Sequence, residues 1–174
     1  NVEVWQGKEY PKELLYAMRM TEKLKTFDSE APESLQLTAR CQHIRRWEIP
    51  RESYEMNRTG YLKWRQDLKK FHAEKASAIL REVGYDQEMI DKVAFLLEKK
   101  QLKKNAETQT LEDVICLVFL EFYFEPFSHK YPEEKLIDIL QKTWRKMSEK
   151  GHDAALKLPL SKESLELVGK ALKG

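Results

Sequence analysis

The stretch TLEDVICLVFLEFYF, from Thr110 to Phe124, decides how this chain folds. Apolar residues occupy nearly every side of the helix that it predicts. A helix that is hydrophobic all round belongs at the centre of a bundle, with other helices packed on it. Thr110, followed by Asp113, is close to the capping box that begins many helices. We therefore expect a central helix over 110–124, with Leu117 and Leu120 almost fully buried.

Other helical segments flank this stretch on both sides, separated by proline, glycine and polar breakers. Their hydrophobic periodicity and breakers place them at 11–25, 32–47, 61–83, 86–99, 133–148 and 161–172. Polar loops are expected at 51–60 and 103–107, and Gly151 is expected to break the helix before it. No alternating pattern of useful strand length is present. The prediction is an all-α, single-domain bundle of six to eight helices over residues 1–174.

The composition excludes several classes of protein. Hydrophobic residues make up 41% of the chain and charged residues 34%, so a folded core is expected rather than disorder. The 31 basic and 29 acidic residues leave a net charge of +2, which excludes a globally basic nucleic-acid coat but not a local basic patch. Six glycines and six prolines are too few for a turn-rich β-sandwich.

The sequence also predicts where the protein resides. The longest apolar run, 114–120, is too short to cross a bilayer, and residues 1–10 contain no apolar core of a signal peptide. Cys41 and Cys116 are far apart and both lie among apolar residues, so we interpret them as buried thiols. Together these features predict a cytoplasmic protein that does not bind a membrane.

Three potential metal ligands lie on apolar helix faces. His72 lies on the apolar stripe of the helix predicted over 61–83, and His43 shares a face with Trp47 four residues on. Asp113 lies at the start of the central helix. Two neutral imidazoles and a carboxylate suit a divalent transition metal, of which the identity stays open. The alternative is structural: each histidine is a hydrogen-bonded core residue and Asp113 is a helix cap. His129 and His152 lie in polar surroundings and are expected at the surface.

A cluster of arginines lies between these histidines. Of the seven cations over residues 40–65, six are arginine, and four aromatic residues interleave with them. Arginine offers a rigid fork for a phosphate or carboxylate, which indicates an anion pocket. The alternative is that these arginines pair with nearby acids and stack on the aromatic rings. The candidate substrate-binding residues are Arg40, Arg46, Arg58 and Arg65. Arg46 is the first choice because it lies three residues after His43, whereas Lys99–Lys100 and Lys103–Lys104 are expected to form a solvated helix end.

Four stretches carry a resemblance to a known family. LTARCQHIRRWEIPRESY, MNRTGYLKWRQDLKKFHAEKA, QTLEDVICLVFLEFYF and KTWRKMSEKGHDAAL resemble the domain-of-unknown-function family numbered 4202, over about residues 14–172. This chain has Glu55 where that family usually has a proline. The family implies no established activity.

The order of His43, His72 and Asp113 is similar, more weakly, to the helical HD metal-dependent phosphohydrolases. In those enzymes a histidine, a His-Asp pair and a later aspartate bind one or two metal ions. This chain has Ala73 after His72, so the pair itself is missing, and Glu112 or Glu74 would have to supply another oxygen ligand. The resemblance implies an HD-like helical fold.

These observations give a leading hypothesis and two rivals. The first is a metal-dependent hydrolase of a phosphate-bearing small molecule or nucleotide, with Glu112 as a further metal ligand or general base. The second is a non-enzymatic helical module that binds nucleic acid or an acidic protein, with both histidines structural. The third is a different metal chemistry, such as that of an iron oxygenase. Bound metal would separate the first from the second.

Overall fold

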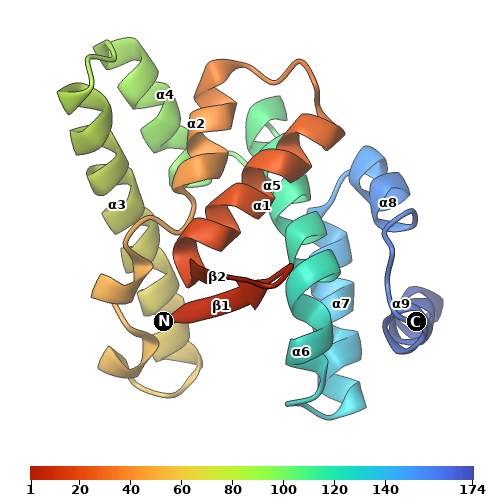
Figure 1. Cartoon of the computed structure of the whole chain (residues 1–174). Helices are drawn as coiled ribbons and strands as arrows, with labels where there is room; N and C mark the ends of the chain where they lie inside the picture. The colour runs from red at the N-terminus through yellow and green to blue at the C-terminus, as the bar shows by residue number, and fades with distance from the viewer. The chain divides into compact units, whose positions relative to one another are not determined.

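The computed structural model describes all 174 residues, and helices dominate it (Figure 1). The predicted all-α fold class is confirmed: the only sheet is a two-stranded one at the N-terminus, beside helices α1 to α9. The chain divides into two compact units, Asn1–Thr108 (unit 1) and Gln109–Gly174 (unit 2), which are described separately below. The expected single domain over 1–174 stays a prediction. No helix is long and apolar enough to cross a membrane.

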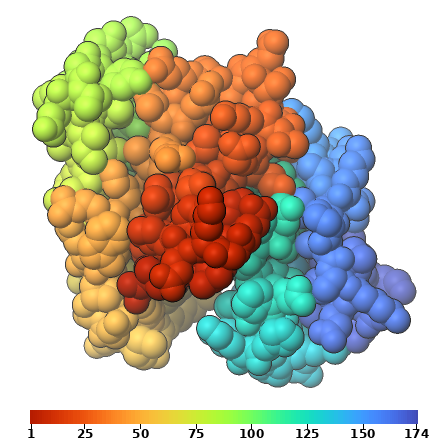
Figure 2. Space-filling model, viewed as in Figure 1, coloured from red at the N-terminus to blue at the C-terminus, as the bar shows by residue number.

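Unit 1 begins with a β-hairpin that the sequence did not predict. Strands β1 (Val2–Trp5) and β2 (Lys8–Pro11) are antiparallel, and the two residues between them, Gln6 and Gly7, both have positive φ angles, of 50° and 76°. A two-residue turn of this kind matches the twist of a hairpin, but its usual signal is Asn-Gly or Asp-Gly. The hairpin residues form part of the visible surface of unit 1 (darkest red in Figure 2).

A partly buried ion pair holds the hairpin against the next helix. Arg19 of α1 (Lys12–Phe27) donates from Nη1 to Glu3 Oε1 at 2.8 Å, and its guanidinium lies 5.6 Å from the Trp5 ring centre. The Arg19 side chain is only 6% exposed. The strands are thus stabilised by contacts with α1, which a local sequence pattern does not reveal.

The other helices of unit 1 pack around small side chains. They are α2 (Glu33–Cys41), α3 (Arg58–Glu82) and α4 (Gln87–Leu97), with two short 3₁₀ turns, η1 (Arg46–Glu48) and η2 (Arg51–Ser53), before α3. Helices α3 and α4 lie side by side (Figure 1). Their shared core consists of Ala73, Ala76, Leu80, Ile90, Val93 and Leu97. The two alanines let the backbones of α3 and α4 approach closely, which fixes the helix that carries His72.

Helix α2 is shorter than expected, and the difference matters for the site. The predicted helix over 32–47 ends at Cys41, because the following bonds are of the tighter i to i+3 kind: Ile44 N donates to Cys41 O, and Arg46 N donates to His43 O. Arg45 then adopts a left-handed conformation with φ 52°. The prediction that His43 and Trp47 share one helix face is therefore wrong.

The loop before α3 contains Glu55, the position at which the resemblance implies a proline. The side chain of Asn57 caps α3 by accepting from Gly60 N at 2.8 Å, and its amide donates to Glu55 Oε2 at 3.0 Å. Glu55 thus holds the cap residue in place, a contact that a proline side chain cannot make.

Unit 2 contains most of the predicted central helix. Helix α5 (Ala106–Val118) passes without a break into a π-helical segment, η3 (Phe119–Tyr123), and then into α6 (Phe124–Ser128). Leu117 and Leu120 are 1% and 4% exposed, as predicted. Pro126 lies inside α6 and does not end the helix. A proline lacks an N–H and crowds the carbonyl four residues earlier, and the wider π turn that precedes it relieves this conflict.

Three helices complete unit 2: α7 (Glu133–Lys146), α8 (Glu149–Ala155) and α9 (Lys162–Lys173). Gly151 was expected to break a helix, but it lies inside α8 and is buried. Ser148 supplies the cap that begins α8, since its Oγ accepts from Gly151 N at 3.1 Å. The end of α7 and the start of α8 are thus separated by a single capped turn.

Candidate functional site

The centre of the candidate site is a pair of histidines in unit 1. His43 lies just past the end of α2, in the turn that leads to Arg45, and His72 lies on the buried face of α3. Their ring centres are 6.3 Å apart. Their positions in the sequence are distant, so only the packing of the chain between α2 and α3 brings them together. The predicted site also included Asp113, and the convergence of all three residues stays a prediction.

His43 is fixed on two sides. Its ring stacks on Tyr16 of α1, with ring centres 3.6 Å apart and planes 7° from parallel. Arg46 Nη1 lies 2.7 Å from His43 Nε2. Because a guanidinium has only donors, Nε2 must accept, and the ring is neutral with its proton on Nδ1. Sequence analysis did not identify Tyr16, which lies far away in the sequence within an ordinary amphipathic helix.

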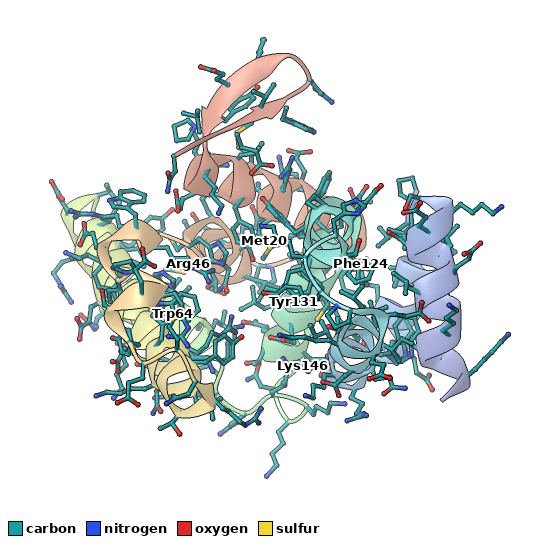
Figure 3. The ribbon with its side chains drawn as sticks, turned by 90° about the horizontal axis from the view of Figure 1, so that it is seen from below. Met20, Arg46, Trp64, Phe124, Tyr131 and Lys146 are labelled. Carbon is teal, nitrogen blue, oxygen red and sulfur yellow. The ribbon has the colours of Figure 1, made fainter.

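Arg46 in turn is held in place by an aromatic ring. Its guanidinium lies 4.9 Å from the centre of the Trp64 ring. Figure 3 labels both residues, in the same part of the view. Trp64 is 8% exposed, and its indole N–H donates to Ile49 O at 2.8 Å. A buried ring anchored at its edge is a rigid support, so the cation above it has a defined position.

His72 differs from His43 because one of its nitrogens has no partner. The residue is 6% exposed, and its Nε2 is buried without any hydrogen bond. Buried polar atoms are almost always hydrogen-bonded in native proteins, so an orphan nitrogen requires an explanation, such as a ligand or ion. The core-histidine alternative predicts a separate hydrogen-bond partner for each ring, and the Nε2 of His72 does not meet it.

The electrostatics of the pair follow from burial and from positive neighbours. Burial lowers the pKa of His72 to about 4, with further contributions from Arg46, Lys99 and Arg65. Burial also lowers the pKa of His43 well below its usual range, and Arg46 adds to this effect. Both rings are therefore neutral at pH 7. Burial, followed by the charge of Arg65, lowers the pKa of Arg46 as well, which shows that these cations repel one another.

Several cations thus surround two neutral rings, and the backbone nearby is strained. Arg45 and Lys99 both adopt left-handed backbone angles, with φ of 52° and 54°. Non-glycine residues in this region cost free energy, and they are concentrated at functional sites. Lys99 was expected to be part of a solvated helix end, but it is half-buried and acts on both histidines. Because Lys99 belongs to a run of lysines, nothing in the sequence distinguishes it from its solvated neighbours.

The four predicted arginines have different surroundings. Arg46 and Arg65 both act on the histidine pair, as the pKa shifts show. Arg40 and Arg58 have exposed side chains, on α2 and on the first turn of α3. Arg40 acts on the neighbouring thiol of Cys41. A role for Arg40 and Arg58 in binding a substrate stays a prediction.

The predicted acidic residues lie in unit 2, and both are buried. Asp113 Oδ1 accepts from Ser148 N at 2.8 Å and from Gln109 Nε2 at 3.2 Å, while its Oδ2 accepts from Ser148 Oγ at 2.5 Å. Asp113 therefore organises the turn between α7 and α8, which is the kind of structural role that the sequence left open. Glu112 is 6% exposed. Convergence of either carboxylate with the histidines stays a prediction.

The remaining histidines occupy different surroundings. His129 is exposed, as expected. His152 is half-buried: its ring stacks on Trp144 with centres 4.1 Å apart, and its Nε2 donates to Trp144 O at 2.7 Å. The expectation of a surface position for His152 is therefore wrong, because α8 folds its side chain back onto α7.

The chemistry of the histidine pair can be compared with what a metal ion requires. Neutral imidazoles are the form that binds a divalent metal, and His72 Nε2 has no competing hydrogen bond. The Nε2 of His43 is engaged by Arg46 and would have to be released first. No group of three or more His, Cys, Asp or Glu side chains is arranged to hold a metal ion. The histidine pair thus offers two nitrogen donors without a third ligand beside them, and several cations act on it.

Comparisons with known proteins were made with the whole chain. The model of a family described as a domain of unknown function (DUF4202) matches residues 1–168. No curated protein and no solved structure matches the chain. The weaker similarity to HD phosphohydrolases gains no support from these comparisons.

Proposed function

The chain belongs to the DUF4202 family, whose description gives no activity, and we propose from its site that it binds and hydrolyses a phosphate-bearing small molecule or nucleotide. The observation that carries the proposal is the histidine–arginine cluster, defined as His43, His72, Arg46 and Arg65. Two uncharged rings, one with an orphan nitrogen, lie among cations that repel one another. A bound anion removes that repulsion and gives the orphan nitrogen a partner.

Arg46 is the main phosphate ligand in this proposal. Its guanidinium is already positioned by Trp64 and costs little entropy to order. Arg65 supplies a second positive charge nearby. A hydrogen bond to a charged group contributes about 1.5–3 kcal/mol, so loss of Arg46 should weaken phosphate binding roughly 10- to 100-fold.

The hydrolytic part rests on the histidine pair. His43 and His72 would be two nitrogen ligands of a divalent metal within unit 1. Such a metal would lower the pKa of a bound water and polarise the phosphoryl group. Arrival of the substrate's phosphate would draw the Arg46 guanidinium away from His43 Nε2, which frees the lone pair that a metal needs. Arg46 thereby links anion binding to the state of the first histidine.

A second candidate is a metal-free module that binds a phosphate-bearing partner, such as nucleic acid. The 2.7 Å contact between Arg46 and His43 favours it, because that contact already uses one of the two ligand nitrogens. In this case the histidines position Arg46, and no reaction takes place.

Titration calorimetry with inorganic phosphate tests the part that the two candidates share. Arg46→Gln and Arg65→Gln should weaken binding. Arg81→Gln should not, because Arg81 is an exposed arginine near the end of α3 and serves as the matched control. If the wild-type protein binds no phosphate, both candidates are wrong.

Metal content and phosphate release then separate the candidates. The protein is incubated with zinc, manganese or iron, desalted, and measured for bound metal and for hydrolysis of a panel of phosphomonoesters. The hydrolase predicts that His43→Gln and His72→Gln each lose both metal and activity, while His129→Gln, at an exposed position, keeps them. Phosphate binding without metal or turnover would select the binding module.

A further inference from the structure

A carboxylate without a partner lies beside the histidine–arginine cluster. Glu13 is in the first turn of α1, three residues before Tyr16. Residues at this spacing lie on the same side of a helix, with their Cβ atoms about 5–6 Å apart. Because the Tyr16 ring stacks on His43, Glu13 belongs to the side of α1 that faces the cluster. The residue is half-buried, and no hydrogen bond or ion pair holds its carboxylate.

The charge of Glu13 acts on Arg46. Burial and the charge of Arg65 lower the pKa of Arg46, and Glu13 is among the groups that oppose this effect. No ion pair joins Glu13 to Arg46, so the carboxylate and the guanidinium act on each other across a gap. A gap between two polar groups is a place where a water molecule can hydrogen-bond to both.

The acids closer to the cluster in sequence are less suitable. Of the four acids between His43 and His72, three already have a partner: Glu48 with Arg45, Glu55 with Asn57, and Asp67 with Tyr54. The fourth, Glu52, is exposed. None of the four is among the charges that shift the pKa of Arg46. Glu13 is therefore the carboxylate in unit 1 that is both uncommitted and placed to act on the phosphate ligand.

We propose that Glu13 is the general base of the hydrolysis and takes the proton of the water that attacks a phosphate held by Arg46. This inference rests on the proposed function. As the water oxygen bonds to phosphorus, one of its O–H bonds breaks and the proton passes to the Glu13 carboxylate. The bond from phosphorus to the leaving oxygen breaks with its electron pair, and that oxygen takes a proton from solvent. Glu13 then returns its proton to solvent.

The two charges are suited to different parts of this step. A guanidinium has five N–H donors, and the one that contacts His43 leaves others for the phosphate and the water. An ionised carboxylate only accepts hydrogen bonds, so it holds the water with an O–H toward itself and leaves a lone pair for phosphorus. Its negative charge also opposes the binding of phosphate. Removal of that charge should therefore tighten binding and slow the reaction, a combination that a merely structural residue would not produce.

Phosphate affinity gives a readout that does not need turnover. Titration calorimetry of the full chain with inorganic phosphate should show at least about threefold tighter binding in Glu13→Gln than in the wild type. Glu22→Gln is the matched control and should change nothing, since Glu22 is exposed on the same helix and pairs with Lys25 at 3.7 Å. Glu13→Ala removes the same charge and serves if circular dichroism shows that Glu13→Gln is not folded.

The rate of phosphomonoester hydrolysis is the second readout. In Glu13→Gln, kcat should fall at least about 100-fold while KM stays the same or decreases. Glu13→Asp keeps the carboxylate on a shorter side chain and should retain part of the rate. Glu112, the general base of the sequence hypothesis, lies in unit 2, and Glu112→Gln tests that assignment in the same assay.

The possible failures can be told apart. If the wild type binds no phosphate, the proposed function fails and this inference fails with it. If the wild type binds phosphate but hydrolyses no ester, the binding module is selected and Glu13 is not a base. If the wild type does both, this inference alone is overturned when Glu13→Gln binds phosphate no more tightly, or when it keeps the kcat of the wild type.

Discussion

Neutral, buried His72 should make the protein sensitive to mild acid, and the size of the effect follows from its surroundings. The pKa of His72 is lowered from 6.5 to about 4 in the folded state, mainly by burial. The unfolded chain therefore binds a proton more readily than the folded one as the pH falls below 6.5. The contribution of neutral His72 to the free energy of unfolding is therefore complete above about pH 6.5, and it is lost as the pH falls from about 6.5 to about 4.

The expected loss can be stated for each pH. A difference of about 2.5 pH units corresponds to about 3 kcal/mol in total, of which about 2 kcal/mol is lost by pH 5. Urea unfolding, followed by circular dichroism at pH 7.5, 6.0 and 5.0 without phosphate, measures this loss. His72→Gln keeps a polar side chain but cannot take up a proton, so its stability should fall by about 2 kcal/mol less over the same range.

A matched variant makes the result specific. His129→Gln removes an exposed histidine and should keep the acid sensitivity of the wild type. If wild type and His72→Gln lose the same free energy between pH 7.5 and 5.0, His72 is not held neutral by its surroundings, and the electrostatic description of the cluster fails.

Three further predictions concern packing and reactivity. Gly151→Ala should destabilise the protein by about 1–3 kcal/mol, because the new Cβ would lie 2.6 Å from Asp113 Oδ1. Gly169→Ala places its Cβ in open space and should instead stabilise the protein by about 0.5–1 kcal/mol. Equal effects of the two substitutions in urea unfolding would contradict the close approach at Gly151. Leu117→Ala should lower the free energy of unfolding by about 2–5 kcal/mol. Leu165→Ala, at a half-exposed leucine, is the control: if it lowers the free energy of unfolding more than Leu117→Ala does, Leu117 is not packed in the core as described. Burial raises the pKa of Cys41 to about 11 against the opposing charge of Arg40, so iodoacetamide at pH 8 should label it at least about tenfold more slowly in the folded than in the urea-unfolded protein, and equal rates by mass spectrometry would refute this.

The spacing of apolar residues correctly predicted which helix positions are buried where the apolar face of the helix alone decides burial. Leu117, Leu120 and His72 all have the burial that their spacing indicates. Glycine and proline signals were less reliable, because their effect depends on neighbours: Pro126 is accommodated by a π turn, and Gly151 lies within α8, where it makes room for Asp113.

The composition of the candidate site could be predicted only in part. The histidines have the residue type of a known chemistry, and Arg46 lies three residues after His43, so the sequence could identify all three. Tyr16 and Lys99 reach the cluster from elements distant in sequence, and neither residue type carries a local signal for such a role. Sequence analysis selected Asp113 because it lies on an apolar helix face. Its hydrogen bonds to Ser148 could not be predicted, because they depend on how the end of α7 meets the start of α8.

Helix α5 begins at Ala106, so the boundary between the two compact units at Thr108 and Gln109 falls within its first turn. Asn105 caps this turn by accepting from the backbone N–H groups of Glu107 and Thr108, both at 3.0 Å. Anyone dissecting the protein by cloning or protease should therefore cut before Asn105 rather than at the boundary. A fragment that starts at Gln109 loses a cap contributing about 1 kcal/mol and would fray at the end that leads to Asp113, so its failure to fold would say nothing about the autonomy of unit 2.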